Sequence, residues 1–209
     1  MAPRQAVVVA PLLALASGDQ QMSRVLVLSP YPERLAPVLI DDDWIATTEP
    51  RSEELVAGRD WLISFGYRHI IREPWLSRFV KAALNLHISL LPWNRGADPN
   101  FWSWADDTQK GVSLHVITAG LDTGPIVAQR LVEFPAGSTL RTSHDLLMDE
   151  AVSLFHDFWQ GDDVTNYLRF PQGLGSYHRA SERLAVWDRF PLGWDTPVAD
   201  ITSAFRPPS

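Results

Sequence analysis

The segment NLHISLLPWNRGADPNFWSW, residues 85–104, places an amide and an imidazole two residues apart. Residues i and i+2 of a β-strand project from the same face, so Asn85 and His87 point the same way if this segment is extended. An amide and an imidazole in that position can hold a carbonyl oxygen and the negative charge that develops on it during acyl transfer. The spacing therefore indicates a pair of residues that stabilises an oxyanion.

A carboxylate would complete this pair as a proton acceptor. Asp122 lies in TAGLDTGP, residues 118–125, where two glycines and a proline predict a tight turn. Beside His87 its carboxylate would raise the pKa of the imidazole and could take a proton from an attacking amine. Taken singly, a strand histidine is usually a core residue, and asparagine and aspartate are common in turns. Only the combination of the three side chains indicates catalysis.

The first half of the chain alternates between short strands and short helices. Four apolar runs predict buried strands: 25–28, 44–48, 60–65 and 84–88. Three helices are predicted between them: 33–40, 52–58 with Ser52 as its cap, and 75–82. This alternation predicts an α/β fold with a Rossmann-like, mostly parallel sheet flanked by helices. Such sheets bind ligands at the carboxyl ends of their strands, which is where Asn85 and His87 are expected.

The second half predicts two more strands and a long helix. Residues 111–117 and 126–132 read as an antiparallel pair, and apolar residues recur at helical spacing over 140–159. Residues 161–209 are rich in proline, glycine and aromatic residues and predict an irregular tail that packs on the core. The expected division is an extension over 1–24, a catalytic domain over 25–160 and the tail over 161–209.

Composition excludes several classes of partner and chemistry. The 209 residues carry a net charge of −7 with no run of Lys or Arg, which argues against nucleic acid as a partner. The absence of cysteine excludes disulfides, thiolate nucleophiles and Cys-ligated zinc. No His, Asp or Glu cluster has the spacing of metal ligands, so no metal is expected. The apolar run near the amino terminus is too short to span a bilayer, so no membrane partner is expected.

The first residues allow two interpretations. Arg4 followed by AVVVAPLLALA has the outline of a secretory signal. The alternative, which we favour, is a translated extension upstream of a start at Met22, because the strand sequence RVLVLSP begins directly afterwards.

Five motifs follow one another in the order and spacing of a known family. They are NLH at 85–87, SLLP at 89–92, RGADP at 95–99, GVSLH at 111–115 and DTGPI at 122–126. In this array the chain resembles the formyltransferases that use 10-formyltetrahydrofolate. The resemblance covers about residues 60–135 and includes SFGYRHII, residues 64–71, a segment that runs along the folate pocket in that family.

The resemblance implies a reaction: transfer of a formyl group from the co-substrate 10-formyltetrahydrofolate to a primary amine of a small polar acceptor, such as a nucleotide-linked amino sugar. Its implied catalytic residues are Asn85, His87 and Asp122. Its implied folate-binding residues are Phe65, Gly66, Tyr67, Leu90, Gly120 and Leu121. Two alternative functions are hydrolysis of the donor to formate and folate-fold binding without catalysis. Because reduced folates are cytoplasmic, the resemblance also implies a cytoplasmic protein.

Three further polar residues are candidates for binding the acceptor, and each has a structural alternative. Arg95 and Asp98 either form an ion pair that braces their loop, or Arg95 meets an anionic group of the acceptor. His115 shares a strand face with Ser113 and Ile117, where it either touches substrate or makes a structural hydrogen bond. The three tryptophans of residues 93–104 are interpreted as packing residues rather than a sugar platform.

The chain departs from the family pattern at three points. The half before Asn85 is shortened, and the turn SPYPERL after the first strand has no phosphate-cradling glycine, which argues against a glycinamide ribonucleotide acceptor. The last 50 or so residues are not basic, which argues against tRNA. The segments NRGADPNFWSW at 94–104, GSYHRASER at 175–183 and GWDTP at 193–197 most resemble a branch grouped near the sugar N-formyltransferases. A homodimer is compatible with the sequence but is not specified by it.

Overall fold

The computed structural model describes residues 22–48, 53–161, 167 and 169–206. Most of the expected extension 1–24 and the predicted cap Ser52 lie outside these residues. Six strands form one sheet in the order β2-β1-β3-β4-β6-β7. Their bounds are β1 Arg24–Leu28, β2 Asp43–Thr47, β3 Trp61–Phe65, β4 Ala82–His87, β6 Gly111–Val116 and β7 Ile126–Leu131. All six strand predictions are confirmed to within two residues at each end.

The sheet combines a parallel half with an antiparallel half. Strands β2, β1, β3 and β4 run parallel, whereas β4 pairs antiparallel with β6 and β6 antiparallel with β7. The predicted antiparallel pair is therefore confirmed. Strand β6 runs antiparallel to β4, with His115 opposite Asn85. The turn that follows β6 therefore begins close to Asn85. This topology brings the turn containing Asp122 toward β4.

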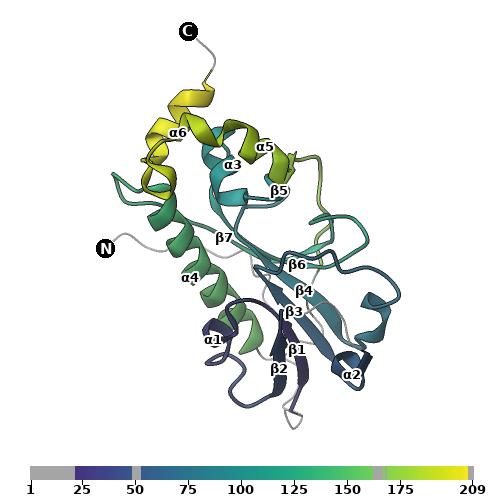
Figure 1. Cartoon of the computed structure of the whole chain (residues 1–209). Coiled ribbons are helices and arrows are strands. Elements are labelled where there is room, and N and C mark those ends of the chain that lie inside the picture. The colour runs from purple at the N-terminus through teal and green to yellow at the C-terminus, as the bar shows by residue number, and fades with distance from the viewer. Residues whose placement is uncertain (1–21, 49–52, 162–166, 168, 207–209) are drawn as a thin grey trace.

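Each face of the sheet has its own apolar cluster. Val25, Trp61 and Phe65 point to the face covered by α1, Pro32–Leu35, and by the long helix α4, Leu140–Trp159 (Figure 1). Leu26, Leu28 and Leu62 point to the other face. There they meet α2, Glu53–Val56, and the segment between β3 and β4. Parallel strands buried on both sides explain why these runs are continuously apolar.

Two helix predictions need correction. The helix predicted over 75–82 is a single 3-10 turn, η1, Leu76–Arg78, and Ala82 already belongs to β4 because it pairs with Trp61. No helix was predicted between the strands 84–88 and 111–117, yet the structure has the helix α3, Pro99–Ala105, there, with Pro99 in its first turn. Proline at the first helical position was the available signal, and the three tryptophans of the segment obscured it. The helix predicted over 33–40 is confirmed only over α1.

The tail is more regular than the sequence suggested. It contains β8, Tyr177–His178, the helices α5, Ala180–Val186, and α6, Val198–Phe205, and the 3-10 turns η2, Trp187–Arg189, and η3, Gly193–Asp195. Helix α6 packs against α3, with Ile201 and Phe101 in one buried cluster (Figure 1). Strand β8 pairs in parallel with β5, Arg95–Gly96. Elements of two to eight residues complete at most about two helical turns, too few for a periodic pattern to be detected.

Helix α4 begins with a capping box. The side-chain oxygen of Thr139 accepts a hydrogen bond from the backbone N–H of Thr142 at 3.2 Å, and the Thr139 backbone N–H donates to the Thr142 hydroxyl at 2.9 Å. Thr139→Ala is expected to lower the free energy of unfolding by about 1 kcal/mol, because an N-terminal amide loses its acceptor. Urea unfolding measures this loss. Thr139→Ser retains the acceptor and is expected to remain within about 0.5 kcal/mol of the wild type; an equal loss in both variants would contradict the role of the cap.

Candidate active site

The three predicted catalytic side chains converge at the end of β4. Asn85 and His87 project from one face of the strand, and Asp122 reaches them from the turn after β6. The Asn85 amide nitrogen lies 3.5 Å from Asp122 Oδ1, and His87 Nδ1 lies 3.8 Å from Asp122 Oδ2. The amide and the imidazole therefore both lie within 4 Å of the same carboxylate.

His115 belongs to the same cluster. It pairs with Asn85 across the β4–β6 ladder and is 1% exposed. Its Nδ1 lies 3.0 Å from the Val116 carbonyl oxygen, so this nitrogen carries the proton and donates. Its Nε2, 3.1 Å from the Asn85 amide nitrogen, is then the acceptor. Of the two roles considered for His115, the structure shows the hydrogen bond, and it orients the Asn85 amide.

His87 is held by a backbone oxygen. Its Nε2 lies 3.0 Å from the Asn94 carbonyl oxygen and donates to it, which leaves Nδ1 facing Asp122. Burial lowers the pKa of His87 below its ordinary value, and the attraction of Asp122 does not offset this. Asp122 does act to raise the pKa of this imidazole, as predicted, but the desolvation of the 6% exposed ring outweighs it, so the net shift is downward. In its resting state His87 is neutral with a free Nδ1 lone pair.

Asp122 accepts hydrogen bonds from the Gly96 backbone N–H, 2.8 Å from Oδ2, and from the Asn85 amide, 3.5 Å from Oδ1. Burial acts to raise the pKa of its carboxyl. The positive charge that His87 or His115 carries when protonated, together with the Gly96 N–H, lowers this pKa well below its ordinary value. Its backbone is left-handed, with φ 50°, a conformation that aspartate tolerates better than most residues. The site therefore contains an ionised carboxylate next to a neutral imidazole at neutral pH.

The lowered pKa of His87 predicts a dependence of stability on pH. The unfolded chain binds a proton at this histidine below about pH 6.5. The folded chain does not, so stability present above that pH is lost as the pH falls toward the folded-state pKa. Urea unfolding at pH 7.5 and 5.5 should show a smaller difference for His87→Asn than for the wild type. The exposed His156→Asn in α4 is the matched control, and an equally reduced difference there would contradict this assignment.

A pocket opens beside the cluster. Asn85, His115 and Asp122 form its polar end. Its other walls come from three segments, represented by Ser64, by Tyr67 and His69–Ile71, and by Ile117–Leu121. Three predicted folate-binding residues, Tyr67, Gly120 and Leu121, line this pocket.

The other three predicted folate-binding residues do not line it. The Phe65 side chain packs on the opposite face of the sheet, against Tyr31. Gly66 lies next to the Tyr31 ring, and Leu90 lies against Gly111. The apolar wall expected at Leu90 is formed instead by Ile70, Ile71 and Ile117. Strand parity accounts for Phe65, because Ser64 and not Phe65 faces the same way as its neighbour Asn85 in the sheet.

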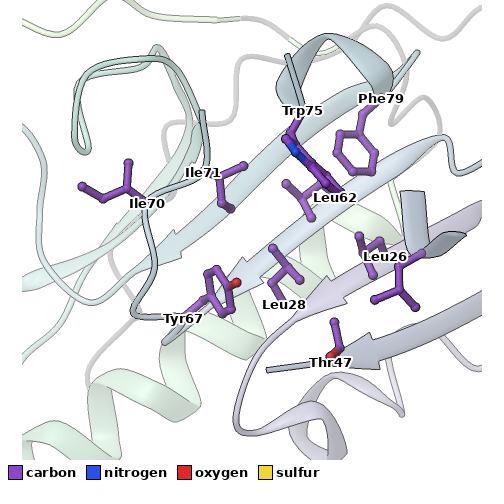
Figure 2. Close-up of a pocket in the computed structure, with 10 residues that line it drawn as sticks. Leu26, Leu28, Thr47, Leu62, Tyr67, Ile70, Ile71, Trp75 and Phe79 are labelled. Carbon is purple, nitrogen blue, oxygen red and sulfur yellow. The ribbon is translucent and has the colours of Figure 1, made fainter. Parts of the chain in front are cut away.

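A second, apolar pocket lies on the same face of the sheet. Figure 2 shows Leu26, Leu28 and Leu62 on their strands beneath Trp75 and Phe79. Tyr67, Ile70 and Ile71 line both pockets, so the segment 67–71 separates the apolar pocket from the polar one. This segment therefore forms a wall that the two pockets share.

Arg95 and Asp98 do not form the ion pair that the sequence suggested. The Arg95 guanidinium donates to the Gln172 side-chain oxygen at 3.0 and 2.8 Å, and Asp98 pairs with Arg183 at 2.8 Å. Both residues therefore bind the tail. A contact between the tail and the loop 95–98 was not predicted from the sequence. Of the tryptophans, Trp102 stacks on His178, Trp104 packs on Phe134, and Trp93 is partly exposed.

Comparison of this chain with known proteins identifies its family. Residues 49–157, more than half of the chain, match the model of the formyl transferase family. The chain belongs to the formyl transferase family. The formyltransferase PseJ from Anoxybacillus kamchatkensis, solved with UDP-4,6-dideoxy-4-formamido-L-AltNAc and tetrahydrofolate, is 36% identical. The match covers 88% of this chain and 100% of that one, with a TM-score of 0.82. Membership of this family makes the protein a formyltransferase enzyme.

More distant formyltransferases share the fold. A likely sugar N-formyltransferase from Mycobacterium tuberculosis is 21% identical, with a TM-score of 0.67 over 79% of this chain and 78% of that one. An N-formyltransferase from Helicobacter canadensis, solved with folinic acid and dTDP-3-aminofucose, is 16% identical, with a TM-score of 0.63 over 78% and 72%. Among the described residues, no helix has the length and apolarity to cross a membrane. Within the same residues, no group of three or more His, Cys, Asp or Glu is placed to hold a metal ion.

Proposed function

We propose that this formyltransferase transfers a formyl group from 10-formyltetrahydrofolate to a primary amine of a nucleotide-linked amino sugar. The observation that carries the proposal is the cluster of Asn85, His87 and Asp122, of which Asn85 and Asp122 line the polar end of a pocket. The 36% identical relative, solved with tetrahydrofolate and a UDP-linked formamido sugar, supports both substrate classes.

Each residue has a distinct role in this proposal. The donor supplies an electrophilic formyl carbon. Asn85 donates an N–H to the formyl oxygen as negative charge develops there. The amine nitrogen bonds to the formyl carbon, and the bond between that carbon and the folate nitrogen breaks. Asp122 takes the proton of the attacking amine and delivers it to the departing folate nitrogen. His87 Nδ1, facing Asp122, shares this proton and becomes a donor to the oxyanion once it is protonated.

The pocket fits the donor we propose. A flat pteridine ring needs apolar walls and polar groups at its reactive end. Ile70 and Leu121 line the pocket yet are 46% and 39% exposed, so a bound ring would cover apolar surface that now faces solvent. We assign Tyr67, Gly120 and Leu121 to donor binding. The turn after β1 fits a nucleotide phosphate poorly, because Pro30 and Pro32 occupy it and the Ser29 hydroxyl already accepts the Tyr31 N–H at 2.9 Å.

We assign the catalytic unit to residues 25–160 and the packing tail to 161–209, as the sequence predicted. The tail contacts α3, α4 and β5. Because the donor is a reduced folate, we also propose that the enzyme acts in the cytoplasm, with small molecules as its substrates.

The test is an activity panel. Purified protein is incubated with 10-formyltetrahydrofolate and a set of nucleotide-linked amino sugars, and tetrahydrofolate release and acceptor mass are followed together. Release that requires an amine, with a formyl group added to it, is the expected result. Formate release without amine would identify a hydrolase. No heat of binding for a folate analogue would identify a protein of this fold that does not bind folate.

A further inference from the structure

The tail segment 172–178, hereafter the strap, contacts both loops that carry the candidate active site. One loop is 94–98, which holds His87 and the Asp122 carboxylate through backbone groups. The other is the turn 120–124, which carries Asp122 itself. The strap is about 50 residues distant in sequence from that turn and about 80 from the first loop.

Gln172 bridges the two loops with one side-chain amide. Its nitrogen donates to the carbonyl oxygens of Asp122 at 3.0 Å and Gly124 at 2.6 Å. Its oxygen accepts both hydrogen bonds from the Arg95 guanidinium. Every polar atom of this partly buried amide is used. Apart from the Asp122 carboxylate, which accepts the Gly96 N–H, no other described side chain links the two loops by hydrogen bonds.

Residues 176–178 of the strap set the direction in which the Gly96 backbone N–H points. Successive N–H groups in an extended chain point to opposite sides. The N–H groups of Arg95 and Ala97 donate to the strap, to the carbonyl oxygens of Ser176 at 3.1 Å and His178 at 3.0 Å. The Gly96 N–H therefore points the other way, to Asp122 Oδ2 at 2.8 Å. A Cβ at Gly96 would collide with the His178 carbonyl, so the close pairing requires glycine.

The strap also holds the loop residue that fixes His87. The Asn94 N–H donates to the Ser176 hydroxyl at 2.8 Å, and the Asn94 side-chain nitrogen donates to Asp106 at 3.1 Å. Asp106 in turn pairs with His178 Nε2 at 2.8 Å. Asn94 is fully buried with a left-handed backbone, φ 57°, and its carbonyl oxygen accepts the His87 Nε2 proton.

We propose that the strap is part of the active site and that Gln172 is a positioning residue, which sets the separation of Asp122 from His87 and from the Gly96 N–H. This inference rests on the proposed function for its kinetic readout but not for its structural one. A tail that only stabilised the fold would need no amide at the junction of these two loops. Small displacements of catalytic groups lower kcat strongly, whereas they alter substrate binding much less.

Two substitutions separate the two halves of the bridge. Gln172→Ala removes both sets of hydrogen bonds. Gln172→Glu keeps an acceptor for Arg95 but replaces the donor to Asp122 and Gly124 with an oxygen that repels their carbonyls. We expect both variants to lose about tenfold or more in kcat with little change in the KM for the folate donor. Arg141→Ala, which breaks the exposed Arg141–Asp195 contact between α4 and the same tail, is the matched control and should retain wild-type kcat.

A carboxyl titration followed by carbon-13 NMR gives the second readout. In both Gln172 variants the Asp122 pKa should rise toward its ordinary value, because the Gly96 N–H no longer meets the carboxylate squarely. Wild-type kcat and an unchanged titration in Gln172→Glu would overturn the proposal, even if Gln172→Ala failed to fold. If the wild-type protein transfers no formyl group to any amine, the proposed function fails, and the titration alone still decides the role of the strap.

Discussion

Asp122→Asn is expected to lower kcat for formyl transfer by about 10²–10⁴, the usual contribution of a positioned general base. The asparagine oxygen can still accept the Gly96 N–H, so the shape of the turn is retained. The neutral amide cannot take the proton of the attacking amine. The KM for the folate donor should change little, because the lost interaction acts on the reacting proton and not on ground-state binding. Steady-state release of tetrahydrofolate measures both constants.

Asp195→Asn is the matched control for this substitution. Asp195 carries the same change from carboxylate to amide, but it lies on an exposed turn of the tail, paired with Arg141 at 2.9 Å. Its kcat should equal that of the wild type. Turnover by Asp122→Asn at the wild-type rate would remove Asp122 from the mechanism, and another group would have to accept the proton.

The parts of the site that the sequence predicted are those set by local periodicity. Asn85 and His87 share a face because strand residues alternate, and the apolar run through Leu84 and Leu86 marks the strand itself. Asp122 could be predicted because glycines and a proline mark its turn, and because two antiparallel strands bring that turn back to β4. His115 follows from the same parity argument on the paired strand.

The parts that the sequence did not predict depend on contacts between distant segments. Strands β5 and β8 are two residues long, too short for any pattern to mark them, and their pairing puts Gln172 between Arg95 and Asp122. The direction of the His87 pKa shift also required the structure. A neighbouring carboxylate and burial act in opposite directions on an imidazole, and only the degree of burial decides between them.

The motif Arg95-Gly96 illustrates both outcomes. Its glycine was visible in the sequence, and the structure explains it, because the strap passes where a side chain would be and the N–H is needed by Asp122. Its arginine was assigned to Asp98 or to an anionic substrate. A charge two or three residues from another is the simplest partner in a sequence, but the chain folds so that a distant glutamine is nearer.

Asn85→Ala is expected to lower kcat by about 10²–10³, the loss found when one oxyanion donor is removed. One N–H of the Asn85 amide is held by His115 Nε2 at 3.1 Å. The other makes only a long contact of 3.5 Å with Asp122 Oδ1, and this is the N–H that can turn to the formyl oxygen when substrate binds. Such a donor gains strength only as charge develops on the oxygen. The loss of activity should therefore fall on kcat, with the KM for the donor nearly unchanged. The urea midpoint should fall modestly, because the buried His115 Nε2 loses its hydrogen-bond donor.

Asn85→Asp separates the loss of the hydrogen-bond donor from a change in the size of the side chain. It keeps the size of the side chain but replaces the NH₂ donor with an oxygen, and it places a second carboxylate beside Asp122. Two carboxylates at this separation oppose both the developing oxyanion and each other's ionisation, so the loss should be at least as large as in Asn85→Ala. Gln160→Ala, which removes an amide at the end of α4 outside the pocket, should leave kcat unchanged. Wild-type kcat in Asn85→Ala, which leaves no donor at this position, would show that a group other than Asn85 stabilises the formyl oxygen.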